Sequence, residues 1–454
     1  MKNVVLAQAS CSVASTAECL KGCELFVEDN VSNVVYFVNQ DNIVILDSEL
    51  MLKDVVQWND QFDSSPVKAD LLQDSNELCI ILRNGQVITM DIESRAICSA
   101  CFLGEECSVA SWSPDQVILT VVEGGRVVFY DRCFEISAEW NTTSCEAGKD
   151  SLVSVGWGAA ETQFQGSAGK AAREKVVEVV RTALPNDTHK PYIRWRADGQ
   201  YVVVSFHEER SGERRIFNRD GELMARLKNV EPLEEVIAVR PTGNYIATTK
   251  QNEDGNRAMV FYERNGEKRH ETVMPSKVGE SQMIDLQWDI DSSCLRVHLR
   301  TEHGDELEIW TESNYDWKRQ WTSRFPQKIV DCQWHAEKGR HMCVLFDDGY
   351  FAQMVFALMP IVAGTESLVI ATDELRFTNF NKFPIPPPLC DFSLPHNGGV
   401  HAASYDGSRL AVLDADCTVR TFPTLLLIDE LSWAVSTLAS RTLQIAIVET
   451  KKIK

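Results

Sequence analysis

The chain contains 454 residues, 44% of them apolar, and its 66 acidic and 45 basic residues give a formal net charge of −21. A chain of this length can bury a large core and has room for two or three domains. The acidic balance argues against broad nucleic-acid binding, because such binding needs cations that displace the counterions of the phosphates.

The first residues and the cysteines indicate an intracellular protein. Residues 1–10 lack the basic stretch and the long apolar core of a secretory signal. The 14 cysteines are irregularly spaced and often stand inside strand-like runs, which is typical of small buried side chains in a reducing compartment. We therefore expect a cytoplasmic location, with the nucleus as a further one.

A pattern of apolar runs separated by polar turns repeats along most of the chain. In order, its units lie at 34–47, 71–91, 111–131, 194–217, 239–263, 287–310 and 332–354. The spacing is regular, since 44 residues separate Trp195 from Val239, a further 49 reach Trp288, and a further 46 reach Trp334. A period of roughly 40 to 50 residues built from short strands is typical of a propeller blade.

Seven units predict an all-β fold, a seven-bladed WD-repeat β-propeller over residues 1–363. One four-stranded blade cannot bury both of its faces by itself, so neighbouring blades must stack around a central channel. The repeat therefore predicts one cooperative array.

The strand pattern continues beyond the seventh unit. Runs at 367–377 and 401–414 flank the proline-rich segment 383–388, and we interpret 364–422 as the start of a second, incomplete propeller. The tail at 423–454 is apolar or amphipathic, and its charged residues keep it short of a membrane span of about 20 residues. No membrane partner is expected.

The sequence shows no arrangement suited to catalysis or to a cofactor. Cys98 and Cys101 form a CxxC pair, but no second pair stands at the spacing of a zinc site. Gly169-Lys170 resembles the end of a phosphate loop, yet Ala171 follows where that motif needs Ser or Thr. The nine histidines form no group with serine or acids that suits acid–base work. We therefore expect no enzyme activity, no metal and no cofactor.

Two basic clusters are candidates for partner binding. Arg214 and Arg215 lie in an arginine-rich hairpin, and Lys318 and Arg319 lie in the segment 317–321, which begins and ends with tryptophan. Interleaved cations and aromatic rings are typical of platforms for single-stranded nucleic acid. The alternative, which we favour, is an outer blade strand with its tryptophans inward and its lysine outward.

The segment 155–169 carries a more specific pattern, with Val-Gly-Trp-Gly at 155–158 and Glu-Thr-Gln-Phe at 161–164. This block resembles the first N-terminal WD-repeat propeller of the scaffold subunit, the largest, of the Elongator complex. Further pieces resemble that family in the same order, and together they cover most of residues 1–422: 111–115, 183–185, 195–200, 261–266, 314–317, 386–390 and 410–415.

The resemblance implies a function that the repeat alone does not. Elongator modifies the wobble uridine of certain transfer RNAs, and its radical-SAM and acetyl-CoA chemistry lies in a different subunit. The chain would then be a non-catalytic scaffold that docks other Elongator subunits, the radical-SAM subunit among them, with only indirect contact to transfer RNA. The family's helical arm and its basic C-terminal segment have no counterpart in this sequence, which puts homodimerisation in doubt.

Other interpretations remain open on the sequence. The repeat equally allows a generic WD-repeat adaptor in trafficking or ubiquitin ligation. A propeller hydrolase would need converging acids or a metal cluster at the channel mouth. The long segment 159–186 is either a contact for a partner or a cover for an edge strand.

Overall fold

The computed structural model contains two compact units. The larger comprises Ala9–Glu306 and Phe325–Met354, and the second comprises Met1–Gln8, Leu307–Arg324 and Val355–Lys454. The structure describes residues 3–58, 64–144, 148–149, 184, 188, 190–208, 211–227, 233–313, 316–359, 361–363, 366–371, 374–378, 380, 389–390, 392–395, 400–405, 409–414 and 418–423. Within those ranges no helix has the length and apolarity needed to cross a bilayer.

Consecutive antiparallel strands form the first four sheets, which we call blades 1 to 4. Blade 1 contains β2 (Leu25–Glu28), β3 (Val35–Val38), β4 (Asn42–Leu46) and β5 (Leu52–Gln57). Blade 2 contains β6 (Pro66–Leu72), β7 (Glu77–Leu82), β8 (Gln86–Asp91) and β9 (Ile97–Phe102). Blade 3 contains β10 (Cys107–Trp112), β11 (Leu119–Glu123), β12 (Arg126–Tyr130) and β13 (Ile136–Asn141). Blade 4 contains β14 (Tyr192–Trp195), β15 (Tyr201–Glu208), β16 (Ser211–Asn218) and β17 (Leu223–Arg226).

Three further four-stranded sheets complete the repeat. Blade 5 contains β18 (Ala238–Val239), β19 (Ile246–Gln251), β20 (Asn256–Tyr262) and β21 (Lys268–Lys277). Blade 6 contains β22 (Gln282–Trp288), β23 (Leu295–Thr301), β24 (Gly304–Ser313) and β25 (Asp316–Phe325). Blade 7 contains β26 (Ile329–Trp334), β27 (His341–Phe346), β28 (Phe351–Met359) and, from the start of the chain, β1 (Asn3–Cys11). These sheets confirm the predicted all-β propeller and its seven repeats.

Burial follows strand position within a blade. The second strand β7 is buried at every position but its first, and β11 is buried throughout. In contrast, five of the six residues of the fourth strand β5 are exposed. The second strand is covered on both faces by neighbouring blades and is therefore mostly apolar, whereas the fourth strand lies at an edge.

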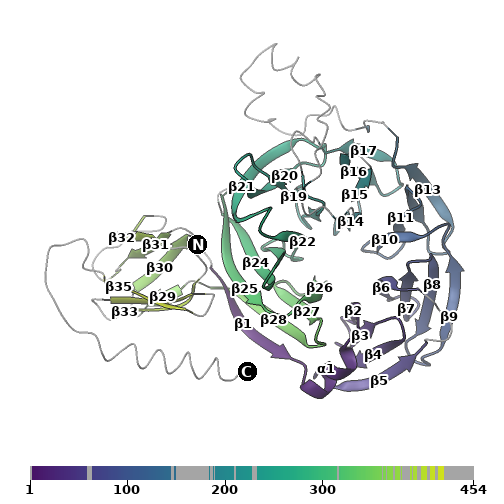
Figure 1. The fold of residues 1–454 in the computed structure, drawn as a ribbon, viewed down its shortest axis with the longest axis horizontal. Helices are drawn as coiled ribbons and strands as arrows, with labels where there is room; N and C mark the ends of the chain where they lie inside the picture. Colours follow the sequence, from purple (N-terminus) through teal and green to yellow (C-terminus); the bar gives the residue numbers. More distant parts are fainter. Residues whose placement is uncertain are drawn as a thin grey trace, which may run out of the picture. The chain divides into compact units, whose positions relative to one another are not determined.

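The seven inner strands form a closed ring within the larger unit. Contacts run in sequence from β2 to β6, β10, β14, β18, β22 and β26, and β26 in turn contacts β2. Figure 1 shows these strands arranged around a common centre. The array therefore has no free end among its inner strands.

Blade 7 is completed by the N-terminal strand, which the sequence did not predict. Its strand order is β1, β28, β27 and β26. Just after β1, the Ser12 amide donates to the Phe351 carbonyl at 2.9 Å, and Ser12 Oγ accepts from the Phe351 amide at 3.0 Å. The short helix α1 (Ala14–Leu20), also not predicted, then leads to blade 1. Residues more than 300 positions apart thus pair at the point of closure.

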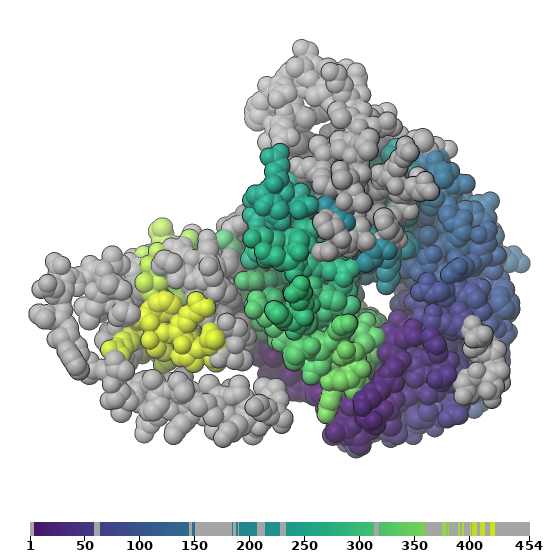
Figure 2. All heavy atoms as spheres, viewed as in Figure 1, coloured from purple at the N-terminus to yellow at the C-terminus, as the bar shows by residue number. Residues whose placement is uncertain are grey.

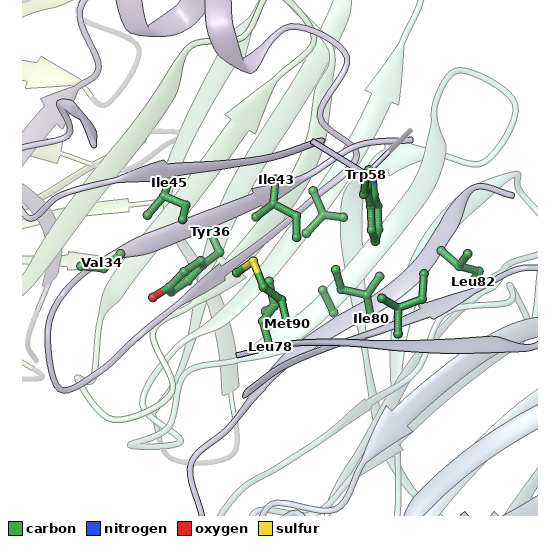
Figure 3. Packing of buried hydrophobic residues seen from close by; sticks show 12 residues of the cluster. Val34, Tyr36, Ile43, Ile45, Trp58, Leu78, Ile80, Leu82 and Met90 are labelled. Atoms are coloured by element: carbon green, nitrogen blue, oxygen red, sulfur yellow. The ribbon is translucent and has the colours of Figure 1, made fainter. Parts of the chain in front are cut away.

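Apolar side chains fill the spaces between blades. Between blades 1 and 2, Tyr36 and Ile43 pack with Ile80 in one buried cluster, shown in Figure 3. Between blades 7 and 1, the ring of Phe351 meets those of Phe26 and Phe37 edge-on, with centroids 5.2 and 4.9 Å apart. Each such side chain contributes roughly 1.5 to 3 kcal/mol when it leaves water, so the blades stabilise one another.

The second unit contains two more sheets. One comprises β29 (Ile361–Ala363), β30 (Glu366–Ala371), β31 (Glu374–Thr378) and β32 (Phe392–Pro395), and the other β33 (Val400–Tyr405), β34 (Arg409–Asp414) and β35 (Val419–Pro423). A small core joins them, in which Leu375 and Phe377 pack with Val400, Leu410 and Val412. The antiparallel order repeats that of the blades. The tail at 424–454 lies outside the described residues.

A buried carboxylate links blade 6 to blade 7. Asp305 accepts hydrogen bonds from Arg300 Nε at 2.8 Å, from His298 Nε2 at 2.9 Å and from the Ile329 amide at 2.8 Å. Burial by itself would raise the pKa of Asp305, but the hydrogen bonds from Arg300 and His298 outweigh it and hold the pKa well below its ordinary value. Burial also lowers the pKa of His298, so its neutral ring donates the Nε2 proton to the carboxylate.

Phe351→Ala should destabilise the ring by about 3 to 5 kcal/mol, because it leaves a cavity at the junction of blades 7 and 1. The matched control is Phe102→Ala, since Phe102 is 66% exposed and its removal should change the free energy of unfolding by less than about 0.5 kcal/mol. Urea unfolding measures both. Equal losses for the two variants would contradict the closure described here.

Asp305→Asn should cost about 3 kcal/mol of stability at pH 7, because it leaves buried donors without their carboxylate. The folded-state pKa is lowered, so this contribution is present above the unfolded pKa of about 3.9 and is lost as the pH falls through the folded value. The difference from the unaltered protein should therefore shrink below about pH 4. Unfolding curves from pH 3 to 8, with Asp220→Asn at an exposed position as control, test this; a difference independent of pH would refute it.

Candidate docking surface

A cavity of about 720 Å³ lies where the inner strands of the larger unit end, and we call it the mouth cavity. Every blade contributes to its wall, and Figure 2 shows an opening near the middle of the ring. Its wall includes Phe26–Glu28, Lys68–Leu71, Ser111–Trp112, Trp195, Pro241, Gln287–Trp288 and Gln333–Trp334. A site of this kind exists only after the ring has closed.

The tryptophans of the sequence repeat stand at this mouth. Trp112, Trp195, Trp288 and Trp334 are the last residues of β10, β14, β22 and β26. Trp112, Trp288 and Trp334 are buried and Trp195 is partly buried; Trp334 Nε1 donates to the carbonyl of Gln287 in blade 6 at 3.0 Å. The repeat thus places an aromatic edge at the end of four inner strands.

Acidic residues outnumber basic ones around the mouth cavity. Its lining includes five carboxylates, those of Glu28, Asp70, Asp74, Asp115 and Glu337, and a single lysine, Lys68. Lys68 Nζ lies 3.1 Å from Asp70 Oδ1, and Asp115 Oδ2 accepts from Arg219 at 2.5 Å. Burial raises the pKa of both Glu28 and Asp70 above their ordinary values.

His335 adds a buried donor to the same wall. It is 6% exposed, and its Nδ1 accepts from the amides of Glu337 and Lys338 at 3.0 and 3.1 Å. The proton therefore lies on Nε2, for which the described residues provide no hydrogen-bond acceptor; Glu28 Oε1 is 3.9 Å away. Burial, together with the charge of Lys338, lowers the pKa of His335 to about 4, so the ring is neutral near pH 7.

The sequence did not single out Glu28, Asp70 or His335. Each is an isolated residue in its own repeat, and only ring closure brings them to one cavity. In the described part of the chain, no three His, Cys, Asp or Glu side chains are grouped so that they could hold a metal ion. The mouth cavity thus offers carboxylate acceptors, neutral donors that include His335, and aromatic edges.

The two arginines that the sequence offered as candidates for partner binding are buried between neighbouring blades. Arg214 and Arg215 are adjacent on β16, and they are 1% and 2% exposed. Successive strand residues face opposite ways, so one points to each neighbouring blade. Arg215 stacks over the Trp140 ring of blade 3 at 3.8 Å, and Arg214 donates to the Glu234 carbonyl beside blade 5. Both guanidinium groups therefore serve contacts between blades.

The other two candidates lie on the outermost strand of blade 6. On β25, Trp317 and Trp321 are 2% and 3% exposed, whereas Lys318 and Arg319 are partly exposed. Arg319 Nη1 donates to the buried Glu308 carboxylate at 2.6 Å. This placement confirms the outer-strand interpretation of the segment. The segment 155–169, on which the family resemblance rests, and most of the segment 159–186 lie outside the described residues.

A second arginine contacts Glu234, through the carboxylate of that residue and not through its carbonyl. Arg257 is fully buried, and its Nε and Nη2 donate to Glu234 at 2.7 and 2.8 Å. The guanidinium also donates to Ser281 Oγ and to the Ser281 carbonyl, each at 2.8 Å. This network holds the segment before blade 5 against that blade.

Arg257→Met should therefore destabilise the protein by about 3 to 5 kcal/mol, because it leaves the Glu234 carboxylate buried without its cation. Arg264→Met, at an exposed position, should change stability by less than about 0.5 kcal/mol. Chemical denaturation measures both. In the double variant Arg257→Met, Glu234→Gln, part of the lost free energy of unfolding should return, because the carboxylate that had lost its cation is gone. If no stability returned, the two side chains would not be coupled and the interpretation would fail.

Comparison with known proteins identifies the family of this propeller. Residues 1–337 match a family model described as the ELP1 first N-terminal beta-propeller. Elongator complex protein 1 of Mus musculus is 29% identical over 386 residues, covering 78% of this chain and 28% of the mouse protein. The protein of the same name from Schizosaccharomyces pombe is 26% identical over 432 residues, covering 86% of this chain and 33% of that protein. The chain thus spans about a third of the length of these relatives.

A solved structure shares the fold. One chain from "Crystal Structure of Mitotic Checkpoint Complex" has a TM-score of 0.50 at 14% identity, over 78% of this chain and 94% of that one. Such a low identity shows the fold alone. The family model, in contrast, covers most of the residues that build the seven blades. The chain therefore belongs to the family of the first N-terminal β-propeller of ELP1.

Proposed function

We propose that this chain is a scaffold that docks partner subunits of an Elongator complex and so supports modification of the wobble uridine of transfer RNAs. The observation that carries the proposal is the family match over residues 1–337, which are the residues that form most of the closed ring. A ring of stacked blades offers rigid surfaces for docking, and loops at its rims select the partner.

In this proposal the chain is not an enzyme. The catalytic chemistry belongs to another subunit, the radical-SAM subunit, and transfer RNA meets this chain only through its partners. The mouth cavity is rich in carboxylates, and four of the repeat tryptophans border it. Such a surface suits a protein ligand better than a polyanion.

Affinity purification of the tagged chain from cells tests the docking role. We expect Elongator subunits to be recovered with it, and Phe351→Ala, which weakens the ring closure, to reduce their recovery severalfold at equal expression. Phe102→Ala serves as the control and should recover them as well as the unaltered chain does.

Other outcomes of the same purification would contradict the proposal. Recovery of coat or cullin components without Elongator subunits would support a trafficking or ubiquitin-ligation adaptor instead. Hydrolase activity that co-purifies with the chain and survives in the isolated protein would show that it is an enzyme.

A further inference from the structure

We propose that the mouth cavity binds a basic segment of a partner protein, with one arginine or lysine side chain inserted between Glu28 and the rim carboxylates of Asp74 and Glu337. The inference deepens the proposed docking role, since it names the chemistry of one ligand. The site is distinct from the outer strands, because it is formed by the inner strands and the turns that follow them.

The charge of the wall points to a cationic ligand. Two of the five carboxylates are already paired, Asp70 with Lys68 and Asp115 with Arg219. For Glu28, Asp74 and Glu337 no ion pair with lysine or arginine is found among the residues that the structure describes. These three carboxylates line the same cavity, so a cation that enters it is attracted by all three.

The buried imidazole of His335 provides a second and independent indication of a ligand. Its Nε2 proton faces no acceptor in the described part of the fold, and Glu28 Oε1 stands 3.9 Å from Nε2. A buried donor that lacks an acceptor is costly, and a ligand that supplies one removes the cost. A peptide group carries both a carbonyl for His335 and an N–H for Glu28, so a main-chain segment suits this corner.

The dimensions and the aromatic rim fit the same ligand. A volume of about 720 Å³ accommodates one long side chain with its flanking residues. Trp334, which precedes His335 in blade 7, borders the cavity and provides an apolar edge along which the methylene groups of arginine or lysine can lie. A nucleic acid would instead bring its phosphates toward unpaired carboxylates, which disfavours it.

The test uses two blocked pentapeptides, acetyl-Ala-Ala-Arg-Ala-Ala-amide and its counterpart with citrulline, which has the same shape but no charge. Calorimetric titration of the full chain at 150 mM salt should show binding of the arginine peptide and at least tenfold weaker binding of the citrulline peptide. A charged hydrogen bond in a partly buried site is expected to give a difference of this order.

Variants then locate the binding. Asp74 and Glu337 are exposed turn residues, so the double variant Asp74→Asn, Glu337→Gln should keep the fold intact. We expect it to bind the arginine peptide at least fivefold more weakly than the unaltered chain does. Adding Glu28→Gln should lower the affinity further. The matched control, Glu49→Gln with Glu93→Gln, removes two exposed carboxylates that do not line the cavity, and it should bind as the unaltered chain does.

The proposal would be overturned if the arginine peptide did not bind, or if the two peptides bound equally well. It would also be overturned if the control variant lost as much affinity as the cavity variant, or if a single-stranded RNA decamer displaced the peptide. The titration contains no Elongator subunit, so its failure would leave the proposed place in that complex to be judged by the purification alone.

Discussion

Packing between the faces of neighbouring sheets is the interaction on which the rest of the structure depends. Second strands such as β7 and β11 are buried on both faces, and only an adjacent blade can cover them. An open array would leave two such faces in water. In the closed ring these two faces cover each other, through contact between β2 and β26 and through the phenylalanine cluster around Phe351.

Closure also determines what the protein can offer a partner. The mouth cavity is built from side chains of all seven blades, each supplied by a different repeat. Because the blades form one cooperative array, Glu28 and His335 are held in place without help from a ligand. Burial lowers the pKa of His335, so its ring is a neutral donor in a wall that also contains Glu28.

Much of the fold could be predicted from the sequence, because the repeat is local. The seven units, their order and the tryptophans that end four inner strands follow from spacing alone. The pairing of β1 with β28 could not, since a closing strand bonds to residues more than 300 positions away. Nor could the burial of Arg214 and Arg215, which depends on both faces of β16 being covered. The mouth cavity was missed for the same reason, as its residues meet only in three dimensions.

Native-state amide hydrogen exchange gives the most direct test of the central claim, that seven blades form one closed cooperative ring. The account predicts that amides of the second strands, from β3 in blade 1 to β27 in blade 7, exchange with one common opening free energy equal to that of global unfolding. Much earlier exchange in β3 and β27 than in β11 or β15 would show an array with two open ends, and it would contradict the account.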